Sequence, residues 1–357
     1  MNDIAIVGGG MAGASLAAAL SGAATVLILE AESQAGYHST GRSAAFWSES
    51  YGGPLIQPLT SLSGPLLADG GFLRPRGAIH IAEAGERHRL ATMQSSFPDV
   101  LLQPLERAAL EAAIPGLRPA WIDGLAEPSC ADIDVAGLHA FYLRQARANG
   151  AVLMPDARLR RAARENGKWR IETDAGTFES DILVDAAGAW ADDVANRCGE
   201  RALAIKPYRR TIAQLRVDPA APPDLPLIVD ASERFYFKPE AGGRLWLSPH
   251  DETPSEPCDC APEEIDVALA IDRLERVVDW RIEAVERKWA GLRTFAPDRA
   301  LKLGFDPGEP RFFWCAGQGG MGIQTAPAAS LLCATLIRGE PLPAELAGID
   351  PADFQPR

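Results

Sequence analysis

Residues 4–13 have the sequence IAIVGGGMAG, residues 14–20 the sequence ASLAAAL, and residues 25–30 the sequence TVLILE. The first apolar run predicts a buried parallel strand, the small residues predict a helix, and the second apolar run predicts another buried strand. The glycines between the first strand and the helix fit the pattern G-x-G-x-x-G. In this order, strand, glycines, helix and strand are typical of a fold that binds a dinucleotide.

Each conspicuous residue of this segment has an expected physical role. Gly8 permits the tight turn, Gly10 leaves room for a pyrophosphate, and Gly13 lets the helix pack closely on the strand. The start of the helix offers free N–H groups to phosphate, and Glu30 is placed to bind ribose hydroxyls. A glycine-rich turn without a ligand is the alternative. The residues expected to bind the cofactor here are Gly8, Gly10, Met11, Ala12, Gly13 and Glu30.

Composition limits the classes of protein that the chain can belong to. It has 357 residues, a net charge of −13 and 47% hydrophobic residues, as expected for a globular enzyme of two lobes. The negative charge disfavours nucleic acid as a partner. With no signal-peptide pattern and no apolar run long enough to span a bilayer, we expect a cytoplasmic protein. Among the six cysteines, Cys258 and Cys260 form an isolated C-x-C without a second ligand pair, so we expect no metal site.

The segment after the second strand helps to identify the dinucleotide. Residues 38–45, HSTGRSAA, are polar and aperiodic, which predicts a loop running over a bound cofactor rather than another strand–helix unit. This favours FAD over a nicotinamide cofactor.

The remaining pattern predicts an α/β fold with a Rossmann-like FAD-binding domain of the glutathione-reductase type and a second, sheet-based substrate domain. Helices are expected at 134–149 and 324–338, within 86–113, and over an amphipathic region at 263–288. Strands are expected on both sides of Asn166-Gly167 and over 182–184, 205–250 and 312–316. The expected FAD domain comprises 1–50, 131–200 and 290–357, and the expected substrate domain comprises 51–130 and 201–289.

Five motifs resemble those of the D-amino-acid oxidase-like family of FAD enzymes, which includes glycine oxidase and sarcosine oxidase. They occur in the family's order and span nearly the whole chain. Within the family, the likeness is greatest to the bacterial D-arginine dehydrogenases. The motifs are GYHSTGRSAA (36–45), ADID (131–134), AAGAW (186–190), WAGLR (289–293) and QGGMGIQT (318–325).

The resemblance implies non-covalent FAD and further residues that bind it. Gly188 would lie near the pyrophosphate, and the turn at 320–325 would offer N–H groups to the flavin C2 oxygen, where reduced flavin carries negative charge. The residues implied are Arg42, Ser43, Ala44, Gly188, Trp190, Gly320, Gly322, Ile323, Gln324 and Thr325.

The resemblance also implies an arginine pair that binds a substrate carboxylate, matched by Arg210 and Arg293. The planar guanidinium suits this role because it binds a carboxylate through two hydrogen bonds and stays charged. Arg209 competes with Arg210 for the position, and structural ion pairs are the alternative for all three. Tyr51 and Tyr236 match positions that close over the substrate, and ordinary core packing with a satisfied hydroxyl is the alternative for both, especially for Tyr51.

Three departures from the D-arginine dehydrogenase pattern concern the substrate side chain. Ala78, Phe46 and Met321 stand where those enzymes have a glutamate, a histidine and a tyrosine. A buried guanidinium without a carboxylate partner is costly, so D-arginine is not the expected substrate.

The predicted function is FAD-dependent oxidation of the Cα–N bond of a small amino acid by hydride transfer to flavin N5. The substrate is expected to be a neutral or apolar D-amino acid, and the products a 2-oxo acid and ammonia. One alternative is an FAD-dependent 2-hydroxy acid dehydrogenase, which normally needs a base that the sequence does not identify. A second is a non-catalytic dinucleotide-binding protein. The electron acceptor is left open between oxygen, a quinone and other acceptors.

Overall fold

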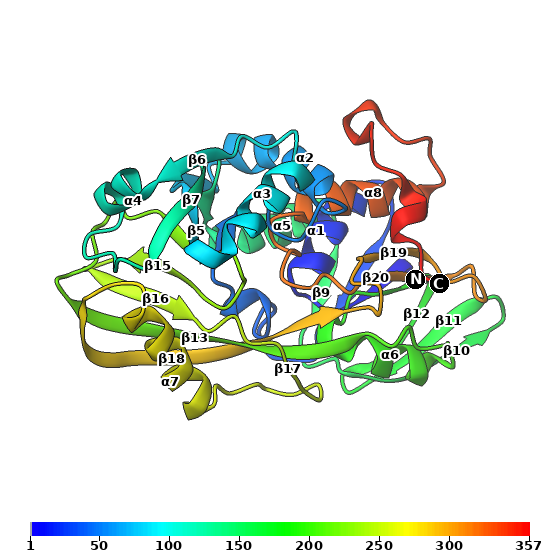
Figure 1. Ribbon diagram of the computed structural model, residues 1–357. Coiled ribbons are helices and arrows are strands. Elements are labelled where there is room, and N and C mark those ends of the chain that lie inside the picture. Colours follow the sequence, from blue (N-terminus) through cyan, green and yellow to red (C-terminus); the bar gives the residue numbers. More distant parts are fainter. Residues whose placement is uncertain (1) are drawn as a thin grey trace.

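The computed structural model describes residues 2–357, and two large sheets dominate it (Figure 1). The first is an eight-stranded sheet in which β1, β2, β9, β12 and β20 run parallel to their neighbours in that group. Its strands are β1 (Asn2–Val7), β2 (Val26–Leu29), β9 (Val152–Met154), β10 (Leu159–Glu165), β11 (Lys168–Thr173), β12 (Gly176–Asp185), β19 (Lys302–Phe305) and β20 (Phe312–Ala316).

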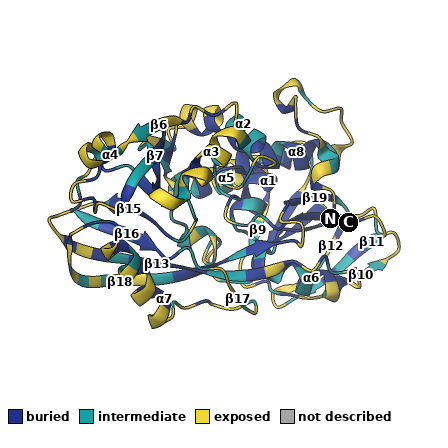
Figure 2. Cartoon of the chain, in the orientation of Figure 1, coloured by how far each residue is buried: buried dark blue, intermediate teal, exposed yellow. Residues whose placement is uncertain are grey.

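Alternate residues of β1 enter two different hydrophobic cores. Ile4 and Ile6 pack with residues of helices on one side of the sheet, whereas Ala5 and Val7 pack with residues of another helix and a hairpin on the other. Both cores are buried (Figure 2). This explains why β1 is a continuous apolar run, because a parallel strand covered on both faces exposes neither set of side chains.

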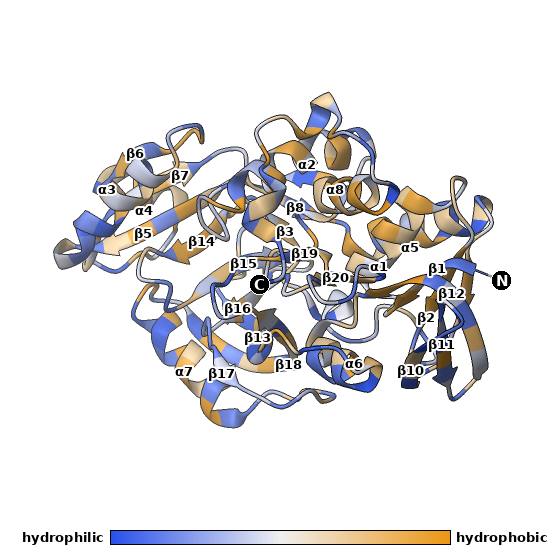
Figure 3. Cartoon of the chain, turned by 90° about the vertical axis from the view of Figure 1, so that its right-hand side faces the viewer, coloured by the Kyte–Doolittle hydropathy of each residue, from blue (hydrophilic) through white to orange (hydrophobic). Residues whose placement is uncertain are grey.

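Eight α-helices surround the sheets within residues 2–357. Helices α1, α5 and α8 contact one another or share a core on one side of the eight-stranded sheet, and their hydrophobic residues gather there in Figure 3. The helices are α1 (Met11–Leu20), α2 (Gln57–Asp69), α3 (Arg87–Ser96), α4 (Arg107–Ala113), α5 (Val135–Ala148), α6 (Ala191–Cys198), α7 (Glu264–Glu275) and α8 (Ala326–Arg338).

The second large sheet has nine strands and packs against α7 and α4 through its own core. Its longest pairing is between β13 and β18, which run antiparallel along their whole lengths. The strands are β5 (Ala78–Glu83), β6 (Gln103–Glu106), β7 (Trp121–Glu127), β13 (Lys206–Asp218), β14 (Leu227–Asp230), β15 (Tyr236–Glu240), β16 (Arg244–Ser248), β17 (Thr253–Pro254) and β18 (Arg281–Phe295). A small sheet of β3 (Phe46–Trp47), β4 (Leu73–Pro75) and β8 (Ala131–Ile133) lies apart from these.

The structure confirms the predicted α/β class and most predicted elements. The hairpin at Asn166-Gly167 joins β10 to β11, with both residues at positive φ. Asp134 caps α5 by accepting a hydrogen bond from the N–H of Gly137.

The prediction for 263–288 is wrong in its second half. Helix α7 ends at Glu275 and β18 begins at Arg281. In β18 alternate positions from Arg281 to Arg287 are exposed, so a period-2 pattern at its start was mistaken for helical amphipathicity. The segment 86–113 also contains a strand, β6, between its two helices.

The two sheets draw on different parts of the chain, and we propose that they mark the two domains expected from the sequence. Strand β18 crosses the proposed boundary at 289/290, so this strand joins the domains rather than ending at one of them. Among the described residues, no helix combines the length and the apolar character needed to cross a bilayer.

The burial of Asp185, at the end of β12, leads to a testable prediction about the pH dependence of stability. The side chain is fully buried, Oδ1 accepts a hydrogen bond from the N–H of Ala187 at 3.0 Å, and Oδ2 has no partner in the described chain. Burial raises the pKa of Asp185 well above its usual value, and the nearby Asp192 and Asp193 add to the effect. A carboxyl group with a raised pKa stabilises the fold fully below the unfolded-state pKa. That stabilisation is lost as the pH rises through the folded-state pKa.

Asp185→Asn is therefore expected to gain stability relative to the unchanged protein as the pH rises from about 4 to about 8, by about 1.4 kcal/mol per unit of pKa shift. Urea unfolding across this range measures the difference. Asp181→Asn is the control, because Asp181 lies on the same strand but pairs with Lys168 at 3.1 Å. A stability difference that stays constant with pH would show that Asp185 does not titrate abnormally.

Candidate active site

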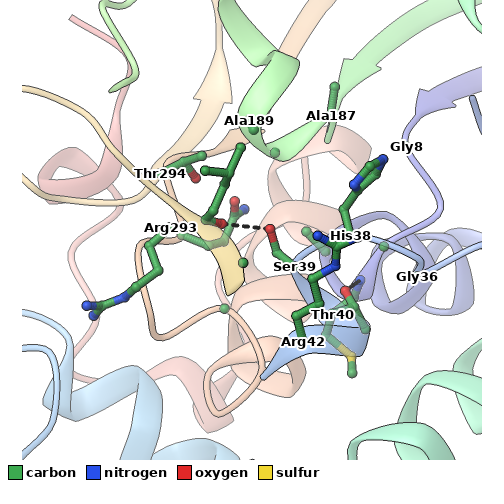
Figure 4. Close-up of a pocket in the computed structure, with 18 of the residues that line it drawn as sticks. Gly8, Gly36, His38, Ser39, Thr40, Arg42, Ala187, Ala189, Arg293 and Thr294 are labelled. Atoms are coloured by element: carbon green, nitrogen blue, oxygen red, sulfur yellow. Dashed lines mark hydrogen bonds between the residues drawn. The ribbon is translucent and has the colours of Figure 1, made fainter. Parts of the chain in front are cut away.

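Residues of both large sheets line one extended cavity. Glu30 and the glycine turn after β1 lie at one end, and Arg210 of β13 and Arg293 of β18 line the other. Figure 4 shows Gly8 on one side of this pocket, the segment 38–42 in the middle, and the guanidinium of Arg293 projecting away on the opposite side. The cavity thus joins the predicted cofactor residues to the predicted substrate residues.

The glycine turn has the geometry that its sequence predicts. Gly8 has φ +105°, and a Cβ there would lie 2.4 Å from the carbonyl oxygen of Ala186. A Cβ on Gly13 would lie 1.9 Å from the carbonyl oxygen of Gly8, so only glycine allows α1 to approach β1 this closely. A Cβ on Gly10 would meet only Thr40 Oγ1, at 3.3 Å, and Gly10 lines the cavity.

Helix α1 points its N-terminus at this part of the cavity. Thr40 Oγ1 accepts a hydrogen bond from the N–H of Met11 at 2.9 Å, whereas the N–H of Ala12, a lining residue, has no acceptor in the described chain. Free N–H groups and the positive end of the helix dipole form a site for an anion.

Glu30 is only 8% exposed, and backbone N–H groups fix its carboxylate. One oxygen accepts from Gly9 at 2.8 Å and the other from Glu32 at 2.9 Å. Each carboxylate oxygen can accept a further hydrogen bond, so Glu30 can still bind hydroxyl groups in the cavity.

The segment 36–45 lines the middle of the cavity and is fastened to the nine-stranded sheet. Ser39 Oγ donates to the carbonyl oxygen of Leu292 at 2.7 Å (Figure 4), and Ser43 Oγ accepts from the N–H of Ala45. The guanidinium of Arg42 donates to the carbonyl oxygens of Cys260 and Ala290 and pairs with Asp259.

Arg42, Ser43 and Ala44 all line the cavity, as do Gly188 and Trp190 in the short helix after β12. Because the hydrogen-bonding capacity of Arg42 is directed at backbone and at Asp259, we propose that Arg42 supports the cofactor site by holding this segment in place.

The residues predicted in the turn before α8 fall into two groups, those that line the cavity and those that do not. Gly320, Gly322 and Ile323 line the cavity, and the N–H groups of Gly322 and Ile323 have no acceptor among the described residues. They are therefore available to an electron-rich oxygen.

Gln324 and Thr325, 2% and 0% exposed, do not line the cavity, and the N–H of Thr325 donates to the carbonyl oxygen of Met321 at 3.1 Å, so it is not free for the flavin as the resemblance implied. The amide of Gln324 donates to the carbonyl oxygen of Tyr51 at 3.0 Å and to Thr60. The hydroxyl of Thr325 donates to the carbonyl oxygen of Met321. These side chains hold the turn and the segment around Tyr51 together.

Arg210 is buried at the other end of the cavity with an unsatisfied donor. Its Nε donates to the carbonyl oxygen of Asp251 at 2.8 Å, whereas Nη2 has no hydrogen-bond partner in the described chain. Burial and the nearby Arg293 lower the pKa of Arg210, although an arginine stays charged in a protein. Asp251 Oδ1 lies 3.8 Å from Nε of Arg210 and Glu252 Oε1 lies 3.6 Å from Nη2, so these carboxylates balance the charge without satisfying the Nη2 donor.

Arg293 lies beside this unsatisfied donor. Its guanidinium donates to Tyr51 Oη and to Glu252 Oε1 and packs against Gly320, where a Cβ would lie 2.2 Å from Nη2. Both arginines therefore line the same end of the cavity, and a pair of guanidinium groups is suited to binding a carboxylate.

The structure settles the competition between Arg209 and Arg210. Neighbouring residues of a strand point to opposite faces, and Arg209 points away from the cavity to pair with Glu263 and with Asp266, the latter at 2.8 Å. Arg209 has the structural role that was the alternative for all three arginines.

Aromatic side chains close the same end of the cavity. The ring of Phe46 packs edge-on against Tyr51 at 5.1 Å and against Tyr236 at 5.7 Å, and all three line the cavity. Tyr236 is 5% exposed, and burial raises the pKa of its hydroxyl, so it stays neutral. The wall that they form consists of three aromatic rings, and Tyr51 Oη in it accepts a hydrogen bond from Arg293.

Two of the three positions expected to set specificity do not reach the cavity. Ala78 is 2% exposed and packs with Cys130 and Leu227 in the cluster that also contains Tyr236. Met321 is 3% exposed and belongs to the core shared by α1 and α8. Only Phe46 lines the cavity, so Ala78 is not a contact residue.

Three titratable residues that the sequence did not single out lie behind the arginine pair. His250, Asp251 and Glu252 follow β16 directly, and this charged run after a strand was the available signal. The ring of His250 lies 5.6 Å from that of Tyr236, and burial with the two arginines lowers the pKa of His250 to about 2. His250 is thus neutral and a poor base.

No cluster of potential metal ligands occurs among residues 2–357. The donors that are present fit FAD instead. Glu30 could offer a carboxylate to ribose, α1 has N–H groups suited to the pyrophosphate, and the turn before α8 has free N–H groups suited to the flavin.

Curated proteins are similar to this chain over different lengths. Glycine oxidase from Geobacillus kaustophilus is 26% identical over 97% of this chain and 95% of the relative. The hydrogen cyanide synthase subunit HcnC from Pseudomonas aeruginosa is 28% identical over 60% of this chain, and the chain spans about half, 51%, of the length of that relative. The chain spans 37% of the bifunctional protein ThiO/ThiG from Synechocystis, at 25% identity.

Solved structures share the fold over the whole chain. Glycine oxidase from Geobacillus kaustophilus superposes with a TM-score of 0.86 and 24% identity, covering 100% of this chain and 98% of that one. L-proline dehydrogenase from P. horikoshii superposes with a TM-score of 0.84 and 20% identity, covering 99% of both chains. These likenesses confirm the predicted fold class.

A family model described as FAD dependent oxidoreductase (DAO) matches residues 3–336, which include the glycine turn, both arginines and the turn before α8. The match and the donors in the cavity agree on the cofactor, and the chain therefore belongs to the FAD dependent oxidoreductase family and uses FAD.

Proposed function

We propose that this enzyme oxidises the Cα–N bond of a small amino acid. The observation that carries the proposal is the free Nη2 of buried Arg210 beside Arg293, at the end of the cavity remote from Glu30. This pair is suited to the α-carboxylate of an amino acid. The curated relatives named glycine oxidase support the substrate class.

FAD held by Glu30, the start of α1 and the turn before α8 would supply the two-electron acceptor for a hydride from the substrate Cα. The substrate would become an imino acid, which water would hydrolyse to a 2-oxo acid and ammonia. The chain supplies position and environment. Arg210 and Arg293 hold the carboxylate, which fixes the direction of the Cα–H bond. The wall of Phe46, Tyr51 and Tyr236 is expected to keep water from this end of the cavity when substrate is bound.

His250, which packs against Tyr236, argues against a 2-hydroxy acid as the substrate. Oxidation of an alcohol requires a group that takes the hydroxyl proton. Because the pKa of His250 is lowered to about 2, its imidazole binds a proton too weakly to act as this base. An amine that arrives uncharged already has its lone pair and needs no such base.

The substrate side chain is proposed to be neutral or apolar. The arginines share the cavity lining with the three aromatics, Ile212 and Gly320. The carboxylates that line the cavity within residues 2–357 are Glu30 and Glu32, next to the glycine turn, and Asp193, which pairs with Arg197. A guanidinium side chain would lose water at the arginine end without gaining a partner, whereas apolar surface gains about 25 cal/mol per Å² on burial. The preference for the D-enantiomer rests on the motif resemblance to the D-arginine dehydrogenases.

We expect anaerobic flavin reduction to be faster, per unit concentration, with D-alanine, D-leucine and D-phenylalanine than with D-arginine. Stopped-flow absorbance of the flavin, run with both enantiomers, glycine and 2-hydroxy acids, measures it. A clear preference for D-arginine would contradict the apolar side-chain site, and reduction only by 2-hydroxy acids would contradict amine oxidation. Stable yellow protein that no substrate reduces would favour a non-catalytic dinucleotide-binding protein.

A further inference from the structure

The arginine pair already has an anionic neighbour in the protein itself. Glu252 Oε1 lies 3.3 Å from Arg293 Nη1 and 3.6 Å from Arg210 Nη2. One carboxylate oxygen therefore lies between the two guanidinium groups that are proposed to bind the substrate carboxylate. The 3.6 Å separation from Arg210 is an ion pair without a hydrogen bond, which is why Nη2 remains unsatisfied.

A third arginine holds Glu252 from the solvent side. Arg299 Nη2 donates to both oxygens of Glu252, at 2.9 and 3.1 Å, and its guanidinium stacks on the ring of Phe295 at 3.9 Å. The side chain of Arg299 is 53% exposed and that of Glu252 is 34% exposed, whereas the side chain of Arg210 is only 7% exposed. Glu252 thus interacts with the inner pair, Arg210 and Arg293, and with the outer cation Arg299. It does not line the cavity.

We propose that Glu252 is an internal competitor for the substrate carboxylate, and that Arg299 limits this competition by drawing Glu252 outward. The proposal rests on the proposed function in one respect, that Arg210 and Arg293 bind a carboxylate in the cavity. A ligand carboxylate and Glu252 interact with the same guanidinium groups, so each weakens the other through repulsion and through competition for N–H donors. Glu252 therefore sets how tightly the site holds carboxylates.

The experiment measures acetate binding to the FAD-loaded enzyme by isothermal titration calorimetry, with the flavin absorbance as a second readout. Glu252→Gln removes the charge at nearly constant shape and is expected to lower the Kd for acetate by about fivefold, as suits a partly exposed ion pair. Arg299→Gln leaves Glu252 to the inner pair and is expected to raise the Kd.

The double variant tests whether the two residues act through one another. In the Glu252→Gln background, Arg299→Gln is expected to change the Kd by less than about twofold, because an exposed charge is largely screened. Glu252→Asp keeps the charge and is expected to bind acetate more like the unchanged enzyme than Glu252→Gln does. With an amino acid that reduces the flavin, Glu252→Gln should lower KM more than it changes kcat.

An unchanged or increased Kd in Glu252→Gln would overturn the proposal, and so would additive effects of the two substitutions. The result does not depend on turnover, because acetate binding needs only the arginine pair. If no amino acid reduces the flavin, the proposed function fails while the acetate titration still decides the role of Glu252. If Arg293→Ala binds acetate as tightly as the unchanged enzyme, the arginine pair is not the carboxylate site.

Discussion

Arg293→Ala is expected to reduce kcat/KM for flavin reduction by roughly 30-fold to several thousand-fold while FAD stays bound. Truncating one partner of a desolvated, hydrogen-bonded charge pair costs about 2–5 kcal/mol, and about 1.4 kcal/mol corresponds to a factor of ten. The guanidinium of Arg293 also holds Tyr51 Oη and packs on Gly320, so its loss loosens both the aromatic wall and the turn before α8. Stopped-flow flavin reduction measures the rate, and the visible spectrum measures bound FAD.

Arg209→Ala is the matched control for this experiment. Arg209 is the neighbour of Arg210 on β13, but it pairs with Glu263 and Asp266 on the other face of the strand. Its loss is expected to lower thermal stability and to leave the rate of flavin reduction nearly unchanged. Equal kinetic losses in Arg209→Ala and Arg293→Ala would mean that the pairing of β13 with β18, and not the carboxylate site, had been damaged.

Gly10→Val is expected to give folded but colourless protein. A Cβ at Gly10 would meet only the side-chain atom Thr40 Oγ1, at 3.3 Å, so a small shift of Thr40 admits it, and the added side chain is expected to occupy space in the cavity beside the start of α1. The pyrophosphate of FAD needs that space, because its oxygens must reach backbone N–H groups. The ratio of visible to ultraviolet absorbance gives the FAD content, and circular dichroism reports folding.

Gly13→Val separates loss of cofactor from loss of fold. A Cβ at Gly13 would lie 1.9 Å from the carbonyl oxygen of Gly8, a backbone atom that cannot move without displacing β1. This variant is therefore expected to fold poorly, in contrast to Gly10→Val. Full FAD content in Gly10→Val would show that the pyrophosphate does not pass Gly10.

Local patterns in the sequence were enough to predict the cofactor end of the site. The turn at Gly8, the start of α1 and the carboxylate of Glu30 follow one another within thirty residues, and their geometry depends on short-range sterics and helix dipoles. The family followed instead from five motifs that span nearly the whole chain, and FAD from these motifs and the aperiodic segment 38–45.

Only the tertiary structure decided the substrate end, because its residues come from strands far apart in the chain. Register between β13 and β18 places Arg210 in the cavity and Arg209 outside it, and a shift of one residue would reverse them. Ala78 packs in the same cluster as Tyr236 but does not line the cavity. Matching positions along a sequence could not show this, because they do not reveal how deeply a side chain is buried. Glu252 lies near the guanidinium groups of Arg210, Arg293 and Arg299 because the chain after β16 folds back toward them. No periodicity or motif in the sequence predicts this cluster of charges.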